Sequence, residues 1–589
     1  MSSSLKSRIL SRPFLLIVLA LAFVTYAGTL GFEFVHDDLQ QIVSNPHVQS
    51  WSYVPRYFTS HIWSHVSPDW GGAHYRPIFL LWLLINHTIF GLNPMGWHFM
   101  TILAYLFAIS MMYLVVEKVT QTSATAGVAA LIFGLHPLHI EAVAWVSGVG
   151  ESLLTALLLC SFLYYLKKPE QTSPASRVRM QSLSLALFAV ALLTKETAIV
   201  FPAIIFAYEW LFGEHDFESN RFDRLRRGLL IIVPYLVIVA IYIPIRLYAL
   251  KGFGATITPL PLSTVLLTLP SLLWFYAKLL IWPFGLSAFY DTPYTTTVTF
   301  SDFILPAIAV TVVVLALWFG SRKSRMVAFA CAWLILPIIP VLNLPSLLKD
   351  EIAHDRYLFL PSIGFSILIA LAVTRLRIGR AAIFGLPVSQ VAAIVVVCGV
   401  LGCATAWQHS FWANEFVLFE QGVKSAPDNR IALNNLGSIM LENGKYDEAV
   451  ELFRRAVDRN PDFRTANLNL GISYCQTGQF EAACQYLNRA IELDPKAVEP
   501  YLYLAIAEIE RGHFIEGRST LEAAEKIRKD MPGIHFWRGM AYRKEKAFNE
   551  AIAEFRAELE INPADRAALK QLSEIDSDRA QRNESSSNR

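Results

Sequence analysis

Two adjacent carboxylates stand near the start of the chain, in the segment Phe34-Val35-His36-Asp37-Asp38. They follow the first apolar run by only a few residues, which places them just above a membrane if that run crosses one. A carboxylate in this place could act as a general base toward an acceptor hydroxyl, and the neighbouring carboxylate would raise its pKa by like-charge repulsion. Such a pair can also begin an ordinary solvated loop.

A second group of ionisable residues follows further along the chain. The segment from His136 to Trp145 contains His139 and Glu141, and Glu151 comes shortly afterwards. The spacing from His139 to Glu141 is too short for the helical HExxH pattern of zinc sites, and no third ligand is evident. We therefore expect no metal site here.

Two more groups could contact a substrate. Lys195-Glu196 forms one of them, although an ion pair that ends a helical hairpin would look the same. The other begins at Lys349 and contains His354, Asp355 and Arg356. An arginine with a histidine at a membrane surface suits a phosphate, because guanidinium forms bidentate, charge-assisted hydrogen bonds. An interfacial arginine that anchors a helix end is the alternative.

The elements that hold these groups are indicated by an uneven distribution of charge. The chain has 589 residues, of which 54% are hydrophobic and 17% are charged. Residues 411–589 hold 24 Lys and Arg and 29 Asp and Glu, out of 98 charges in the whole chain. This composition excludes a single soluble globule, a disordered chain and a small disulfide-stapled domain. The net charge of +2 gives no indication of nucleic-acid binding.

The first 410 residues are expected to form a membrane domain of about eleven transmembrane helices. A span needs about 20 mostly apolar residues. The predicted spans are roughly 13–30, 96–117, 124–140, 150–166, 181–195, 197–213, 228–247, 301–319, 326–344, 356–375 and 384–404. Two further apolar stretches, 77–90 and about 265–283, are flanked by Pro and Gly, and we expect them to lie at the outer interface.

The basic residues agree with this count. Lysine and arginine gather on the cytoplasmic side of membrane proteins. With eleven spans, the clusters at 167–179, 221–227, 322–325 and 375–380 all share one side with the basic N-terminus. That side is expected to be the cytoplasm. The four ionisable groups above and everything after residue 405 then lie outside, in a periplasm or lumen.

The charged part of the chain repeats with a period of 34 residues. Small residues recur at Gly437, Gly471, Ala505 and Gly539, and prolines recur at Pro427, Pro461, Pro495 and Pro563. This pattern resembles the tetratricopeptide repeat, in which stacked helical hairpins form an α-solenoid. We expect a membrane domain over 1–410, a linker over 411–426, about four repeats over 427–576 and a disordered tail over 577–589.

Taken in order, several segments resemble one family, the transmembrane and tetratricopeptide-repeat O-mannosyltransferases, which belong to the polyprenyl-phosphate-sugar-dependent glycosyltransferases of the C-type fold. The matching segments are FVHDDLQQIVSN from Phe34, Arg76-Pro77, HPLHIEAVAWVSGVGES from His136, Lys195-Glu196-Thr197 and DRYLFLPSIGF from Asp355, followed by the repeats. The resemblance covers nearly the whole chain. It implies an all-α enzyme and a bacterial-type member of the family.

The resemblance implies transfer of mannose or another hexose from a lipid-phosphate carrier to Ser or Thr hydroxyls on the outer face. The catalytic carboxylate would be Asp37 or Asp38. Residues expected to contact donor or acceptor are Arg76, His139, Glu141, Lys195, Glu196, His354, Asp355 and Arg356. Because a polyprenyl phosphate is a good leaving group, no metal or other cofactor is expected. The repeats would hold the acceptor polypeptide.

Two other functions fit parts of the sequence. An outer-face oligosaccharide ligase also combines many spans with outer loops, but its chemistry would be expected in one large loop late in the membrane domain. A non-catalytic membrane scaffold or transporter would use the repeats to recruit partners, but transporters usually carry mid-membrane charges and internal duplication. Neither feature is evident in this sequence.

Overall fold

The computed structural model describes residues 13–66, 74–167, 170, 173–213, 221–252, 260–344, 352–376, 382–383 and 386–587. The chain forms two compact units, Met1–Gln421 and Gly422–Arg589. The predicted group that begins at Lys349 lies partly outside the described residues, because these resume only at Ile352. All the residues predicted above to contact a substrate lie within them.

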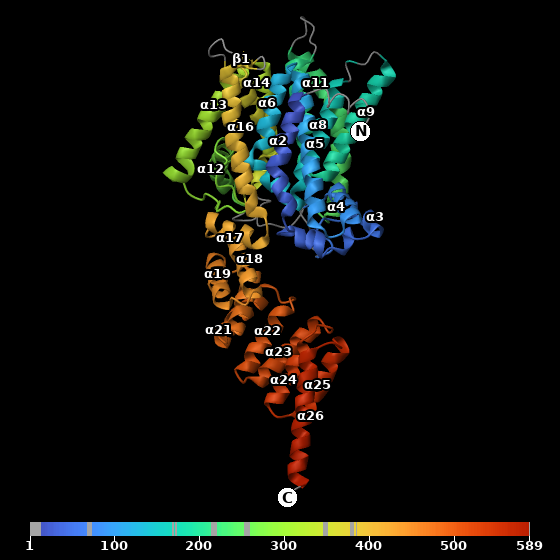
Figure 1. The fold of residues 1–589 in the computed structure, drawn as a ribbon, viewed down its shortest axis with the longest axis vertical. Coiled ribbons are helices and arrows are strands. Elements are labelled where there is room, and N and C mark those ends of the chain that lie inside the picture. The colour runs from blue at the N-terminus through green and yellow to red at the C-terminus, as the bar shows by residue number, and fades with distance from the viewer. Residues whose placement is uncertain are drawn as a thin grey trace. The chain divides into compact units, whose positions relative to one another are not determined.

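The first unit is a bundle of helices (Figure 1). Its helices are α2 (Pro13–Tyr26), α3 (Val54–Tyr57), α4 (Pro77–Phe90), α5 (Pro94–Thr120), α6 (Ser123–Leu135), α7 (Ile140–Ala144), α8 (Gly150–Lys167), α9 (Pro174–Thr194), α10 (Phe201–Phe212), α11 (Arg221–Ala249), α12 (Leu262–Ile281), α13 (Leu305–Lys323), α14 (Arg325–Ile335), α15 (Pro361–Val373) and α16 (Val388–Gln408). The strands β1 (Ala382–Ile383) and β2 (Leu386–Pro387) form one short hairpin. The prediction of an all-α protein is confirmed.

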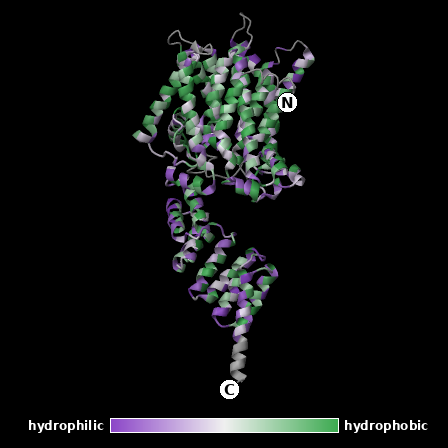
Figure 2. Ribbon diagram, viewed as in Figure 1, coloured by the Kyte–Doolittle hydropathy of each residue, from purple (hydrophilic) through white to green (hydrophobic). Residues whose placement is uncertain are grey.

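The helices differ in how much of their apolar surface the bundle covers. Of the most apolar window of each helix, 72% is buried in α5 but only 6% in α13. Helix α5 packs against α6 and α8, at the centre of the bundle. Figure 2 shows the bundle as mainly hydrophobic along its helices. A helix as apolar and as exposed as α13 suits contact with lipid.

The number of spans differs from the eleven predicted. Within the described ranges, nine helices are long and apolar enough to cross a membrane, or ten if α6 and the bent segment Pro137–Ala144 count as one span. The predicted spans at 197–213 and 356–375 contain the short helices α10 and α15. Each of these helices has a proline in its first turn and follows a 3₁₀ turn, which shortens the regular helix.

Helix α12 passes the same length and composition test, although the sequence predicts an interfacial helix there. Residues in both halves of α12 form hydrogen bonds with loop residues. The Thr268 hydroxyl accepts a hydrogen bond from the Thr295 N–H, and the Tyr276 hydroxyl donates one to the Ile352 carbonyl. The length of α12 therefore permits it to cross a membrane. Its hydrogen-bond partners Thr295 and Ile352 lie in the loops that precede α13 and α15.

The second unit consists of helical hairpins that follow the predicted 34-residue period. They are α18 (Arg430–Glu442) with α19 (Tyr446–Arg459), α20 (Arg464–Gln476) with α21 (Phe480–Leu493), α22 (Glu499–Glu510) with α23 (Phe514–Ile527), and α24 (Ile534–Lys544) with α25 (Phe548–Ile561). A Cβ atom on Gly437 would lie 2.7 Å from the Phe453 ring. The repeated small residue is therefore required where the two helices of a hairpin cross.

In two predicted segments the structure contains helices where the sequence predicts none. The expected linker 411–426 contains α17 (Glu415–Ser425), whose residues Leu418 and Phe419 bury their side chains within the first unit. The expected disordered tail is helical as far as Ser587, in α26 (Arg566–Ser587). That helix begins with good helix formers and packs on α25, and a polar final helix caps a solenoid.

Candidate active site

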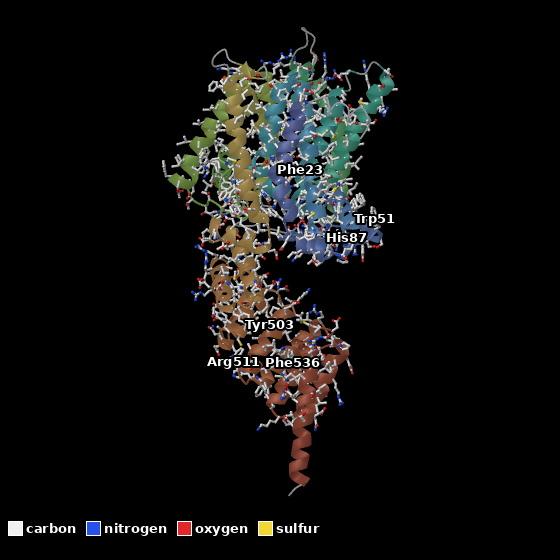
Figure 3. All side chains as sticks on the ribbon, viewed as in Figure 1. Phe23, Trp51, His87, Tyr503, Arg511 and Phe536 are labelled. Carbon is white, nitrogen blue, oxygen red and sulfur yellow. The ribbon has the colours of Figure 1, made fainter. Side chains whose placement is uncertain are left out.

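The predicted groups lie on loops that meet at one end of the bundle. The Glu33 N–H donates a hydrogen bond to the Ala413 carbonyl, and the Gln408 side chain bonds to the Pro283 carbonyl. Trp51 and His87 lie at this end in Figure 3. We call it the candidate-site end. The chain also leaves α16 there, at residue 408, so the last helix of the bundle ends on the same side as the Asp37-Asp38 pair.

Asp37 lies on a strained turn. His36 before it has φ = +55°, a left-handed conformation that side chains other than glycine rarely adopt and that is enriched at functional sites. The His36 ring stacks on Phe289 at 5.8 Å between centroids, and its Nδ1 lies 2.9 Å from Asp37 Oδ1. The Asp37 side chain remains 30% exposed, so that a substrate can reach its carboxylate.

The charges around Asp37 keep it ionised. Burial alone would raise its pKa, but the positive fields of His36, Arg356 and His74 and the hydrogen bond from His36 lower it below the ordinary aspartate value. A carboxylate that is ionised at neutral pH, partly exposed and oriented by a histidine has the properties of a general base.

Asp38 has a different environment. Its side chain is fully buried. One carboxylate oxygen accepts hydrogen bonds from the Ser147 N–H at 2.8 Å and the Ser147 hydroxyl at 2.5 Å, and the other accepts one from the Val35 N–H at 3.3 Å. Burial outweighs these bonds and raises the pKa of Asp38 to about 7. Asp38 ties the first loop to the loop after α7, while Asp37 faces the open side.

This burial gives the protein a pH-dependent stability. Because the folded state raises the Asp38 pKa, it binds more protons than the unfolded state between about pH 4 and pH 7, so stability should fall as pH rises through that window. The contribution is at most about 1.4 kcal/mol per pH unit. Thermal unfolding in detergent at pH 5 and pH 8 should show a smaller pH effect in Asp38→Asn than in the wild type. An unchanged pH effect would contradict the assignment.

Arginine and lysine side chains at the candidate-site end are each paired with a carboxylate from another loop. Arg356 forms an ion pair with Glu141, and the Arg356 N–H also donates to Glu141 Oε2 at 3.0 Å. Lys195 forms an ion pair with Glu151. These pairs join loops that are far apart in the sequence, so the loops form one charged cluster.

Arg76 and Glu196 complete this cluster. Arg76 binds the carboxylate through two nitrogens, with Nε at 3.0 Å from Oε2 and Nη2 at 2.7 Å from Oε1. His74 lies 3.2 Å from the same carboxylate. Burial opposes ionisation of Glu196, but Arg76 and His74 hold its pKa well below the ordinary value. The fork geometry fixes the position of α4 against the loop after α9.

Asp355 lies beside the Arg356–Glu141 pair. The Tyr290 hydroxyl donates a 2.5 Å hydrogen bond to its Oδ1. Burial and the neighbouring Glu141 charge raise the pKa of Asp355 well above its ordinary value. The His354 ring packs edge-on against Tyr357, and its Nδ1 is buried with no hydrogen-bond partner among the described residues. His354 therefore has a nitrogen free to bond to a ligand.

His139, which was predicted to contact donor or acceptor, lies in the core of the bundle. Its side chain is fully buried among Phe133 and Phe359. Both ring nitrogens are already engaged, Nδ1 with the Tyr105 hydroxyl at 2.7 Å and Nε2 with the Ser362 hydroxyl at 2.9 Å. These bonds connect His139 to α5 and α15 in the core. Glu141, two residues later, is instead paired with Arg356 in the charged cluster.

Several residues of this end were not predicted. Ser147 holds Asp38, Tyr290 holds Asp355, and Phe289 stacks on His36. Trp145 lies under the Arg356 guanidinium, 5.5 Å from it. Ser147 and Trp145 stand within or next to a predicted group, so proximity could have indicated them. Tyr290 and Phe289 lie in an irregular loop with no sequence signal that we recognise.

No metal centre is evident in the described residues, because no three His, Cys, Asp or Glu side chains converge in a way that could hold an ion. The carboxylates Glu141, Glu151 and Glu196 are instead paired with Arg or Lys. The expectation that catalysis needs no metal remains a prediction.

The chain is similar to several curated protein O-mannosyl-transferases. The chain is 24% identical over 473 residues to protein O-mannosyl-transferase TMTC3 of Mus musculus, covering 74% of this chain and 50% of that protein. It is 27% identical over 483 residues to TMTC1 of Homo sapiens, covering 72% and 52%. It is 24% identical over 451 residues to F38B6.6 of Caenorhabditis elegans, covering 74% and 61%. The chain thus spans about half to three fifths of the length of these relatives.

The repeats also match. A family model described as tetratricopeptide repeat matches residues 418–462, 439–498 and 502–566. Among solved structures, a thermophilic tetratricopeptide-repeat protein of Thermus thermophilus is similar, with 22% identity, a TM-score of 0.25, and coverage of 29% of this chain and 92% of that protein. The resemblance drawn from the sequence motifs is confirmed: about three quarters of the chain is similar to curated protein O-mannosyl-transferases, and its C-terminal part matches the tetratricopeptide-repeat model.

Proposed function

We propose that the protein is an integral-membrane glycosyltransferase that moves mannose or another hexose from a polyprenyl-phosphate carrier to Ser or Thr hydroxyls of a polypeptide. The relatives' name, protein O-mannosyl-transferase, supports this class of reaction. The observation that carries the proposal is the contrast at the Asp37-Asp38 pair. Asp37 is accessible and is kept ionised by His36, Arg356 and His74, whereas Asp38 is buried and hydrogen-bonded.

In the proposed mechanism Asp37 takes the proton of the acceptor hydroxyl as the oxygen attacks the anomeric carbon of the sugar. The bond between that carbon and the phosphate oxygen breaks, and the polyprenyl phosphate leaves with the electron pair. We assign to Arg356 the stabilisation of the phosphate charge, because its positive charge acts on Asp37 and its side chain is 26% exposed. No metal is needed in this scheme.

The polar residues around Asp37 have supporting roles. Arg76, Lys195, Glu141 and Glu196 fix the loops through their ion pairs. His354 offers a free nitrogen to the donor, and Asp355 with Tyr290 supports the position of Arg356. The lipid carrier comes from the surrounding membrane. We propose that the repeats bind the acceptor and raise its local concentration.

We propose that the N-terminus lies in the cytoplasm and the candidate site and repeats lie outside, in the periplasm of a bacterium. An alkaline phosphatase that folds only outside the cytoplasm should be active when fused after Arg589. The same reporter fused after Lys323, at the opposite end of α13, should be inactive. Activity in the Lys323 fusion, with none in the Arg589 fusion, would reverse the orientation.

A comparison of cells with and without the gene tests the function. Mass spectrometry of proteins from the outer compartment should show hexose on defined Ser or Thr residues only where the gene is present. Transfer of a preassembled oligosaccharide would instead indicate a ligase. An unchanged set of glycoproteins would favour a scaffold that recruits partners through its repeats.

A further inference from the structure

Trp145 lies between the two groups to which the proposed mechanism assigns the chemistry. The Arg356 guanidinium carbon lies 5.5 Å from the centroid of the indole ring, and the centroid of the His36 ring lies 5.8 Å from it. His36 in turn holds Asp37, with 2.9 Å between His36 Nδ1 and Asp37 Oδ1. One aromatic ring therefore contacts both the arginine and the histidine that orients the carboxylate.

The Arg356 guanidinium is held by two aromatic rings and one carboxylate. Tyr357 provides the second ring, with 5.6 Å between its centroid and the guanidinium carbon. Both distances are within the range of a cation–π attraction. Glu141 pairs with Nη1 and also accepts a hydrogen bond from the Arg356 backbone N–H. Within the described residues, Nε and Nη2 of Arg356 form no hydrogen bond, so this edge of the guanidinium can bind a phosphate.

The loop that carries Trp145 is itself fixed on two sides. It follows α7 and continues into a 3₁₀ turn over Val146–Val149. In that turn, the N–H and hydroxyl groups of Ser147 both donate to the buried Asp38 carboxylate. Trp412 stacks on the indole ring, with 6.1 Å between the centroids. Trp145 is only 8% exposed, so packing and the bonds of this turn determine where its ring lies.

The ring surface of Trp145, and not its N–H group, makes these contacts. The indole Nε1 is buried and has no hydrogen-bond partner among the described residues. Arg356 and His36 approach the ring itself. Phenylalanine would therefore keep an aromatic surface beside both groups, whereas an aliphatic side chain would remove it.

We propose that Trp145 is a positioning residue that sets the distance between Asp37 and Arg356, and so between the proton acceptor and the departing phosphate. The inference rests on the proposed function and adds to it the residue that holds its two halves in register. Both groups must act in one transition state, and a misplacement of about 1 Å can lower a rate by about 10²-fold.

Two substitutions at Trp145 test this role, with the full-length protein, a polyprenyl-phosphate hexose and a Ser/Thr peptide. Trp145→Leu should lower kcat by about 10²-fold, whereas Trp145→Phe should lower it by less than about five-fold. The peptide KM should change less than two-fold in both. Equal losses of kcat in the two variants would assign the effect to the N–H group and overturn the inference. An unchanged kcat in Trp145→Leu would also overturn it.

Trp333→Leu is the matched control for the loss of a buried tryptophan. Trp333 of α14 is 1% exposed and packs edge-on against Phe162 of α8, with 6.3 Å between centroids. This variant should unfold at a lower temperature than the wild type, while kcat stays within two-fold. A loss of kcat as large as that of Trp145→Leu would overturn the inference, because it would follow from the loss of any buried indole.

A double variant tests whether Trp145 acts through Arg356. In protein that already carries Arg356→Met, one of the two groups positioned by Trp145 is absent. Adding Trp145→Leu should therefore lower kcat by less than about ten-fold, since the effects of residues that act together are not additive in free energy. A further loss of about 10²-fold would show that Trp145 acts elsewhere and would overturn the inference.

Binding of the leaving group can be measured without transfer. Farnesyl phosphate carries the same phosphate on a short isoprenoid chain, and calorimetry in detergent would give its Kd. The Kd should rise at least five-fold in Trp145→Leu and less than two-fold in Trp145→Phe. This pattern without any hexose transfer by the wild type would contradict the proposed function alone. Hexose transfer by the wild type, with Kd and kcat unchanged in Trp145→Leu, would contradict the role of Trp145 alone.

Discussion

Asp37→Asn should lower kcat for hexose transfer by about 10²- to 10⁴-fold, the usual contribution of a general base. Asparagine keeps the size of the side chain but cannot take the acceptor proton. The side chain is partly exposed and its contact is with His36, so the fold should tolerate the change. Initial rates with a polyprenyl-phosphate hexose and a Ser/Thr peptide would measure the effect.

Asp38→Asn is the matched control for this variant. Asp38 is buried and its oxygens already accept three hydrogen bonds, so we expect less than about a ten-fold loss of kcat, with a change in pH-dependent stability instead. Thermal unfolding should confirm that both variants are inserted and folded. A larger loss of kcat in Asp38→Asn than in Asp37→Asn would exchange the roles that we assign to the two residues.

Breaking the ion pair between Arg356 and Glu141 should have two separable effects. Glu141 is only 3% exposed, so Arg356→Met leaves a buried carboxylate without its cation and should destabilise the protein by about 3–5 kcal/mol. The same variant removes the charge that we assign to the departing phosphate, which should lower kcat by about 10²- to 10³-fold.

A double variant separates these effects. Arg356→Met with Glu141→Gln removes the unpaired charge, while Gln can still accept the hydrogen bond from the backbone N–H of residue 356. Most of the lost stability should return, as measured by thermal unfolding in detergent. The transfer rate should stay low. Recovery of the rate together with stability would show that Arg356 acts only by holding the loops.

Much of this architecture could be predicted from apolar runs and from repeats. The period that joins Gly437, Gly471 and Gly539 reflects close contacts between the helices of each hairpin, which only a small residue allows. The count of spans was less certain from sequence, because a proline after a 3₁₀ turn shortens α10 and α15 without changing their hydropathy.

The candidate site was predicted in part. Alternation of the spans placed Asp37, Glu141, Lys195 and Arg356 on one side, where the structure also brings them together. The sequence could not predict which of Asp37 and Asp38 is accessible, because the burial of Asp38 depends on its hydrogen bond with Ser147, which lies more than a hundred residues away in the chain. Likewise, nothing in the spacing of His139 distinguishes a residue of the core from one of the site.

The central claim is that this chain transfers a sugar from a lipid phosphate by way of Asp37. The most direct measurement is single-turnover transfer from a radiolabelled polyprenyl-phosphate mannose to a Ser/Thr peptide, with wild-type protein and Asp37→Asn reconstituted in parallel. We predict mannosyl peptide and free polyprenyl phosphate in equal amounts from the wild type, and at least a hundred-fold slower formation of both from the variant. Equal rates in the two proteins would contradict the account.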